Sequence, residues 1–163
     1  MAVRSHSALI NKAGGAKVAR HGVFETDWDL FSRLDEEFHF TLDVCALPHN
    51  RKCARFISPA EDGLQQPWDG VCWCNPPYGQ GQLKFWVAKA YQESRKSTIA
   101  VLLIPVITDR AWWHDYVLKA DEVRFFRGCP KFYGCQSSPT PLCLVVFRPG
   151  CQGPPQVRSM ESR

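Results

Sequence analysis

The feature that most limits the possible fold is an unbroken apolar and β-branched run, TIAVLLI at residues 98–104. Strands that are apolar along their whole length, rather than at alternate positions, are covered on both faces, as in parallel sheets flanked by helices. Pro105 follows the run directly and predicts that the strand stops there. The run therefore predicts a central strand with other elements packed on both sides of the sheet.

Helical and strand-like patterns alternate along the rest of the chain. Apolar side chains recur every three or four positions in three predicted helices, at residues 26–38, 82–94 and 109–120. Further strands are predicted at residues 40–43, 52–58, 70–74, 121–127 and 142–147, of which the second is short. This alternation predicts an α/β fold with a mostly parallel sheet, ending in an antiparallel pair formed by the last two strands.

Length and composition bound the class of protein. A chain of 163 residues with 45% hydrophobic and 22% charged residues is typical of one soluble globular domain. We expect a flexible basic arm at residues 1–22, the domain at 23–149 and a flexible tail at 150–163. No signal-peptide pattern and no long apolar run are present, so we expect a cytoplasmic protein without membrane contact or an obligate protein partner.

The eight cysteines predict neither a disulfide framework nor a metal site. Disulfides require an oxidising compartment, and zinc ligands usually come in pairs two to four residues apart. Here the closest pair is Cys72 and Cys74, which alternate along a predicted strand and therefore share one face. We interpret both as small core residues and expect no metal.

A rigid tetrapeptide, Asn75, Pro76, Pro77 and Tyr78, follows the strand predicted at residues 70–74. The Asn75 side-chain oxygen and the Pro76 carbonyl are two acceptors that can hold the hydrogens of a planar amine. Two prolines restrict the backbone and so fix the direction of these acceptors. Tyr78 offers a flat face for stacking. The arrangement predicts stabilisation of a nitrogen that becomes positively charged during methyl transfer, although a loop with a packed tyrosine is the alternative.

The sequence between about residues 24 and 149 resembles the small phage-type DNA adenine N6-methyltransferases. The resemblance is carried by ETDWDLFSRLDEEFHFTLDVCA, NRKCARFISPAEDGL with Trp68 after it, VCWCNPPYG, LLIPVITDRAWWHDYV, and EVRFFRGCPKF with LVVF after it. It implies a compact Rossmann-like methyltransferase core, S-adenosyl-L-methionine as cofactor, and double-stranded DNA as partner. It also implies transfer of a methyl group to adenine N6 after the base is flipped out of the duplex.

The resemblance implies roles for individual residues. Asn75, Pro76, Pro77 and Tyr78 correspond to the catalytic motif. Residues that correspond to cofactor-binding positions are Thr26, Asp43, Cys45, Ala46, Asn50 and Asp62. For Asp43 the alternative is a capping or solvated carboxylate, and for Asn50 and Asp62 it is an ordinary polar role in a loop.

Two departures from the broader methyltransferase pattern bear on the cofactor site. The stretch DVCALPHN contains no glycine, whereas a Gly-x-Gly turn usually follows the first strand. About thirty residues separate Asp43 from Asn75, too few for two complete strand-helix crossovers. The region between the cofactor and catalytic motifs is therefore predicted to be shortened, with at least one helix missing.

Cationic and aromatic residues predict where DNA binds. The candidates are Arg110, Arg127, Lys131 and Phe132, the last three within an irregular connection at residues 127–141. Such a mixture grips phosphates and supports an unstacked base, and the net charge of +4 permits contact with a polyanion. A solvated strand connection is the alternative. Recognition of a DNA site is expected to come from such loops and from the basic arm.

Two other functions remain open from the sequence. The same acceptors suit another planar nitrogen, such as a protein glutamine amide or an RNA adenine. The absence of Gly-x-Gly also leaves room for a non-catalytic nucleic-acid-binding module with a methyltransferase-like core. The phage-type resemblance further implies a phage- or prophage-encoded protein in a bacterial host, where such methylation masks DNA from restriction.

Overall fold

The computed structural model describes residues 24–79, 81–133 and 140–163. The predicted basic arm at 1–22 lies outside the described residues. In chain order the helices and strands are α1 (Trp28–Phe38), β1 (Leu42–Asp43), β2 (Val71–Cys74), α2 (Leu83–Ser94), β3 (Ile99–Pro105), α3 (Ala111–Asp115), a 3-10 turn (Val117–Lys119), β4 (Glu122–Arg127), β5 (Leu142–Phe147) and β6 (Gln156–Glu161).

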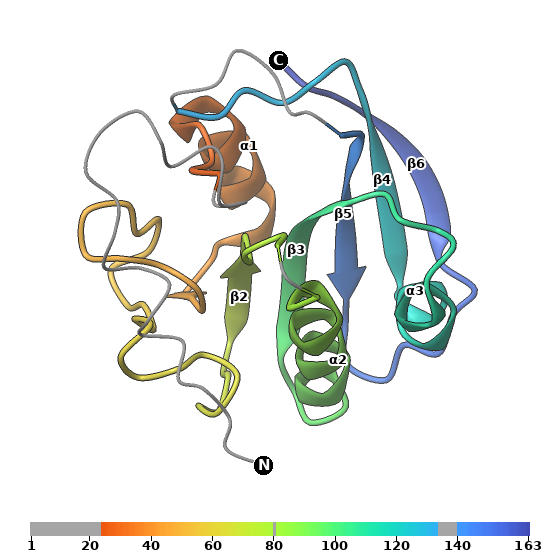
Figure 1. Ribbon diagram of the computed structural model, residues 1–163, viewed down its shortest axis with the longest axis horizontal. Helices are drawn as coiled ribbons and strands as arrows, with labels where there is room; N and C mark the ends of the chain where they lie inside the picture. Colours follow the sequence, from red (N-terminus) through yellow and green to blue (C-terminus); the bar gives the residue numbers. More distant parts are fainter. Residues whose placement is uncertain (1–23, 80, 134–139) are drawn as a thin grey trace.

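The strands form a single sheet in the order β1-β2-β3-β5-β4-β6 (Figure 1). β1, β2 and β3 are parallel neighbours, and β6 is parallel to β4. β5 runs antiparallel to both β3 and β4. The prediction of a mostly parallel α/β sheet that contains an antiparallel pair, β4 with β5, is confirmed, but the sheet does not end in that pair because β6 follows parallel to β4.

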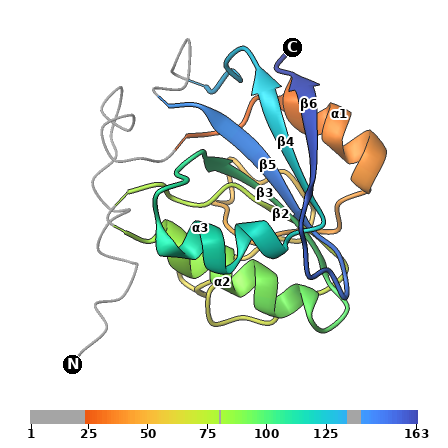
Figure 2. The same cartoon turned by 90° about the vertical axis from the view of Figure 1, so that its right-hand side faces the viewer.

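Helices cover both faces of the sheet (Figure 2). α1 contributes its whole apolar stripe to one core, together with Trp73 and alternate residues of β3 and β5. α2 and the turn after α3 pack on the other face, in a core that includes Cys72 and Cys74. Because alternate strand residues point to opposite faces, the two cysteines lie together beneath α2, as predicted.

The start of α1 is defined by a side-chain cap. Asp27 is extended and accepts a hydrogen bond from the Asp29 backbone N–H at 2.8 Å, which satisfies one of the free donors of the first turn. The helix ends at His39, which is left-handed with a φ of 55°. This short, sharply ended helix leaves Thr26 in extended backbone just before the cap, where it can pair with another segment.

Three sequence predictions of local structure need correction. Residues 52–58 form no strand; they make one bridge, Asp43 to Phe56, because β1 offers only two residues to pair with. The helix predicted at 109–120 is interrupted at Tyr116, where φ is −127°, and continues only as a 3-10 turn. The tail predicted to be loose contains β6, which extends the sheet beside β4.

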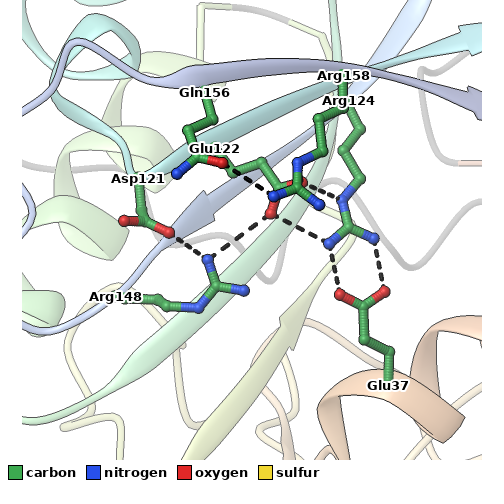
Figure 3. Close-up of polar contacts among 7 residues, drawn as sticks. All are labelled: Glu37, Asp121, Glu122, Arg124, Arg148, Gln156 and Arg158. Atoms are coloured by element: carbon green, nitrogen blue, oxygen red, sulfur yellow. Dashed lines mark hydrogen bonds and ion pairs between the residues drawn. The ribbon is translucent and has the colours of Figure 1, made fainter.

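Charged side chains tie β6 and α1 to β4 (Figure 3). Glu122, which is 3% exposed, accepts from Arg124 Nε at 2.7 Å and lies 3.1 Å from Arg158 Nε on β6. Arg124 also donates to both carboxylate oxygens of Glu37 on α1. Arg148 pairs with Asp121 and lies 3.7 Å from Glu122. Hydrogen bonding to Arg124 lowers the pKa of Glu37.

Candidate active site

The carboxyl ends of three parallel strands meet at one edge of the sheet. Asp43 on β1 pairs with Trp73 on β2, and Cys74 pairs with Leu102 on β3. Asn75 therefore leaves the sheet beside the end of β1. This is the edge at which open α/β sheets bind their ligands.

Asn75 is held in one orientation by its neighbours. Its side-chain nitrogen donates to the Phe24 carbonyl at 2.5 Å and to Thr26 Oγ1 at 3.0 Å. Its oxygen accepts from the Tyr78 hydroxyl at 3.0 Å. Because two acceptors face the nitrogen, the amide oxygen is directed away from them and toward Tyr78.

Tyr78 lies three residues on and is anchored to the sheet. Its hydroxyl also lies 3.0 Å from the Leu103 carbonyl of β3, so one proton has two acceptors. Burial raises the pKa of Tyr78 well above its ordinary value, which keeps the hydroxyl protonated. The Tyr78 ring contacts that of Phe24, with centroids 5.7 Å apart and planes inclined by 32°. Of the two prolines between Asn75 and Tyr78 in the chain, Pro76 is buried and Pro77 is half-buried.

Residues 24–26 dock against the segment after β4. Thr26 forms an antiparallel bridge with Phe132, and the Tyr133 N–H donates to the Glu25 carbonyl at 3.1 Å. The Phe24 and Phe132 rings lie 5.3 Å apart. The structure thus brings together Thr26, predicted to bind the cofactor, the Asn75 motif, and Phe132, predicted to bind DNA. Phe132 is only 3% exposed, so it supports Phe24 rather than lying on the surface.

Asp43 caps the loop that follows β1. The carboxylate accepts from the Cys45 N–H at 3.2 Å and from the Lys52 N–H at 2.9 Å, and the residue is 3% exposed. Burial raises the pKa of Asp43 to about 6, although both backbone hydrogen bonds lower it. The capping role considered from the sequence is therefore present, and a contact with cofactor stays a prediction.

The other predicted cofactor residues organise the loops around the end of β1. Asn50 accepts from the Leu47 N–H at 2.8 Å, and Asp62 accepts from the Leu64 N–H at 3.1 Å. Ala46 is 5% exposed. Cys45 lies near Asp43 and Asp62, whose charges add to burial in raising the pKa of its thiol. A contact of Cys45 or Asp62 with cofactor stays a prediction.

Gly63 explains how the second of these loops approaches β1 so closely. A Cβ at this position would lie 2.2 Å from the Val44 carbonyl oxygen and 2.9 Å from the Trp86 ring. Only glycine allows this contact. Gly63 lies twenty residues after Asp43 and packs this loop against the chain directly after β1.

The predicted DNA-binding cations are exposed. The side chains of Arg110 and Arg127 are 65% and 79% exposed, with carboxylates of Asp109 and Glu161 at 3.7 Å. Lys131 is exposed. Arg127 is the last residue of β4 and Arg110 follows β3, so both lie at the carboxyl edge of the sheet.

Three residues at this edge were missed by the sequence prediction: Phe24, Glu25 and Lys52. Phe24 and Glu25 precede the recognisable helix pattern, and Lys52 is one of 20 basic residues without any distinguishing spacing. No signal in a single sequence marks them. Their proximity to Asn75 arises only from the docking of residues 24–26.

Other kinds of site were sought in the described part of the chain. No group of three or more histidine, cysteine or acidic residues there is placed to hold a metal ion. The seven cysteines within it are all free; Cys135 lies outside the described residues. Among the described helices, none is long and apolar enough to cross a bilayer.

The fold and this candidate site define an α/β protein with an oriented Asn-Pro-Pro-Tyr motif at the carboxyl edge of a mostly parallel sheet. Residues 15–139 match the family described as DNA N-6-adenine-methyltransferase (Dam). The chain belongs to this family.

A curated relative is also similar. Over 104 residues the chain is 33% identical to a protein of Haemophilus phage HP1 (strain HP1c1) named DNA N-6-adenine-methyltransferase. The match covers 62% of this chain and 60% of that relative, so the chain spans less than two thirds of the relative's length.

Proposed function

We propose that the protein transfers a methyl group from S-adenosyl-L-methionine to N6 of adenine in DNA. The observation that carries this proposal is the orientation of Asn75 at the carboxyl edge, with its nitrogen held by Phe24 and Thr26 and its oxygen accepting from the Tyr78 hydroxyl. Membership of the family supports the choice of adenine N6 as acceptor. The compact sheet, in which β1, β2 and β3 are consecutive parallel neighbours, supports a shortened Rossmann-like core.

The residues present fit the cofactor. Its amino-acid end carries both charges, and the edge offers acidic groups at Glu25 and Asp43 beside a buried cation, Lys52. Thr26, Cys45 and Asp62 would complete the contacts to the cofactor. When bound, the cofactor supplies an electrophilic methyl group on a sulfonium.

The residues of this chain would prepare the acceptor nitrogen. The Asn75 oxygen and the Pro76 carbonyl would accept the two N6 hydrogens, which draws the nitrogen lone pair out of the ring and stabilises the charge that develops. Tyr78 can release the Asn75 oxygen without losing its own bond, because the hydroxyl proton can turn fully to the Leu103 carbonyl.

Phe24 would have to move before a base could stack on the side of Tyr78 that Phe24 covers. The two rings are in direct contact, which leaves no space for a third ring between them. A base flipped out of the duplex would therefore displace Phe24 from Tyr78. Since the Phe24 carbonyl also holds Asn75, base entry and release of the amide would be coupled.

The central test is Asn75→Ala with methyl-labelled S-adenosyl-L-methionine and duplex DNA. Loss of a preorganised donor or acceptor from such a site typically costs about 100- to 1,000-fold in rate. We expect a loss of this size, with circular dichroism and cofactor binding retained. Wild-type protein that binds the cofactor and leaves DNA unlabelled contradicts the proposal.

The identity of the methylated product distinguishes the alternative functions. Mass spectrometry of nucleosides from DNA and RNA, and of peptides, identifies the acceptor in expressing cells. Lack of cofactor binding by calorimetry would instead favour a non-catalytic nucleic-acid-binding module. We further propose action on DNA in a bacterial host, to be checked by digesting DNA from expressing cells with endonucleases sensitive to adenine methylation.

A further inference from the structure

Lys52 is a buried cation without a hydrogen-bond partner. Its side chain is 3% exposed, and its Nζ makes no hydrogen bond to any described residue. The nearest carboxylate oxygen belongs to Glu25, at 3.5 Å. The Trp28 ring lies over the ammonium at 4.1 Å, and the Tyr133 ring at 5.5 Å. A buried ammonium has three donors to satisfy, so this position calls for an acceptor beyond those that the described residues supply.

This cation lies at the ligand edge of the sheet. The Lys52 backbone N–H donates to Asp43 at the end of β1, and its side chain reaches Glu25, the neighbour of Thr26. Thr26 in turn accepts from Asn75. The unsatisfied donors of Lys52 therefore lie beside Glu25, which is part of the 24–26 segment that holds the predicted catalytic amide of Asn75.

The side chains that cover the Lys52 ammonium on one side can move. Glu25 is 31% exposed, Trp28 45% and Tyr133 50%, so the ammonium lies just beneath half-exposed side chains rather than deep in the core. Rotation of Glu25 opens a path to it. Burial lowers the pKa of Lys52, while the charges of Glu25, Asp43 and Asp27 raise it.

We propose that Lys52 binds the α-carboxylate of S-adenosyl-L-methionine, and that the acidic groups around it receive the ammonium of the same amino-acid end. This inference rests on the proposed function. A carboxylate completes the hydrogen bonding of the buried ammonium with a charge-assisted bond. The surrounding Glu25, Asp27 and Asp43 complement the positive charges of the cofactor.

A DNA phosphate fits this position less well. The carboxylates of Glu25, Asp43 and Asp27 around Lys52 repel a polyanion, and the Trp28 ring covers the ammonium, which hinders the approach of a duplex backbone. The exposed cations Arg127 and Lys131 are the better phosphate contacts. The position thus favours a small zwitterion over the DNA backbone.

The test compares two ligands that differ in the carboxylate alone. The full chain and its Lys52→Met variant are titrated by calorimetry with S-adenosyl-L-methionine and with its decarboxylated form. Methionine keeps the apolar stem beneath Trp28 and removes the charge. We expect wild type to bind the intact cofactor on the order of 10- to 100-fold more tightly than the decarboxylated one. Lys52→Met should abolish this preference and leave affinity for the decarboxylated form unchanged.

A second variant covers the case in which Lys52→Met does not fold. Lys52→Arg keeps a carboxylate-binding cation and should retain the preference for the intact cofactor. Equal affinity of wild type for both ligands overturns the inference and leaves the proposed function standing. Equal loss for both ligands in Lys52→Met assigns Lys52 a structural role, and a change confined to DNA affinity assigns it to a phosphate; both overturn it. No binding of S-adenosyl-L-methionine by wild type overturns the proposed function as well.

Discussion

At the scale of single residues, the ring and the hydroxyl of Tyr78 have separate predicted roles. Its ring is predicted to support the base, whereas its hydroxyl holds the Leu103 carbonyl and the Asn75 oxygen. These two roles can be removed separately, because phenylalanine keeps the ring and alanine removes both.

We predict that Tyr78→Phe retains most of the methyl transfer to DNA and loses about 1 kcal/mol of unfolding free energy, the worth of an ordinary hydrogen bond. Tyr78→Ala should lower transfer by roughly 10- to 100-fold, because base stacking contributes about 1–3 kcal/mol. Initial rates with labelled cofactor and urea unfolding measure the two effects. Equal loss of transfer in both variants would assign the role to the hydroxyl.

Asp43 makes stability depend on pH. Its pKa is raised to about 6 from 3.8, so the folded state favours the protonated carboxyl. The resulting stabilisation is fully present below about pH 4 and is lost as the pH rises through about 6. The difference corresponds to about 3 kcal/mol.

We therefore predict that the unfolding free energy of wild type, relative to Asp43→Asn, falls by up to about 3 kcal/mol between pH 4 and pH 7. Urea unfolding at a series of pH values, followed by tryptophan fluorescence, gives this difference. A difference that does not vary with pH contradicts the assignment to Asp43.

At the scale of elements, Glu122 connects three parts of the fold. It is 3% exposed and lies between Arg124 on its own strand, Arg158 on β6 and Arg148 after β5. Arg124 also forms an ion pair with Glu37 and so links α1 to the same network. Loss of the central carboxylate would leave the buried Arg124 paired with Glu37 and without Glu122, the more deeply buried of these two carboxylates.

We predict that Glu122→Gln lowers the unfolding free energy by roughly 3 kcal/mol, as expected for breaking a buried ion pair. The matched control is Arg158→Ala, whose side chain is 58% exposed and which should cost less than about 1 kcal/mol. Denaturant unfolding of both variants tests this. Similar small losses in the two would show that the network contributes no stability of its own.

Hydrophobic patterns in the sequence predicted the helices and strands that bury apolar side chains, and they missed a strand that does not. α1 follows its predicted stripe of Leu30, Phe31, Leu34 and Phe38, and β3 follows its apolar run. β6 is exposed along most of its length, with Val157 68% exposed, so no hydrophobic period marks it. Its pairing depends on β4 and on the Glu122 network instead.

The residues of the candidate site also differ in whether a local sequence pattern reveals them. The tetrapeptide of Asn75 to Tyr78 is recognisable because its chemistry is local. Phe24 and Lys52 are not, since each acquires its role from a segment distant in the chain: Phe24 through Asn75 and Lys52 through Glu25. Such contacts leave no periodic or compositional trace.

At the scale of the whole molecule, exposed cations at the carboxyl edge predict how DNA binding depends on salt. Arg127 and Lys131 lie on this edge, beyond β4. Lys96 lies at the opposite end, between α2 and β3, and its side chain is 65% exposed. These positions provide a test and a matched control of the same charge.

We predict that Arg127→Ala and Lys131→Ala each reduce the slope of log affinity against log salt by about 0.9, the value for one lost phosphate contact. Lys96→Ala should leave the slope unchanged. Fluorescence anisotropy with duplex DNA over a range of salt concentrations gives the slopes. Equal slopes in all four proteins would place the DNA elsewhere on the molecule.

The sequence by itself determined the α/β class, the covered central strand and the Asn-Pro-Pro-Tyr motif, because these follow from periodicity and from local backbone chemistry. Only the tertiary structure decided that residues 24–26 hold Asn75, that the Lys52 ammonium is buried without a hydrogen bond to a described residue, and that β6 joins the sheet. Each of these depends on contacts between segments far apart in the chain, whose energies come from burial and pairing that no local pattern encodes.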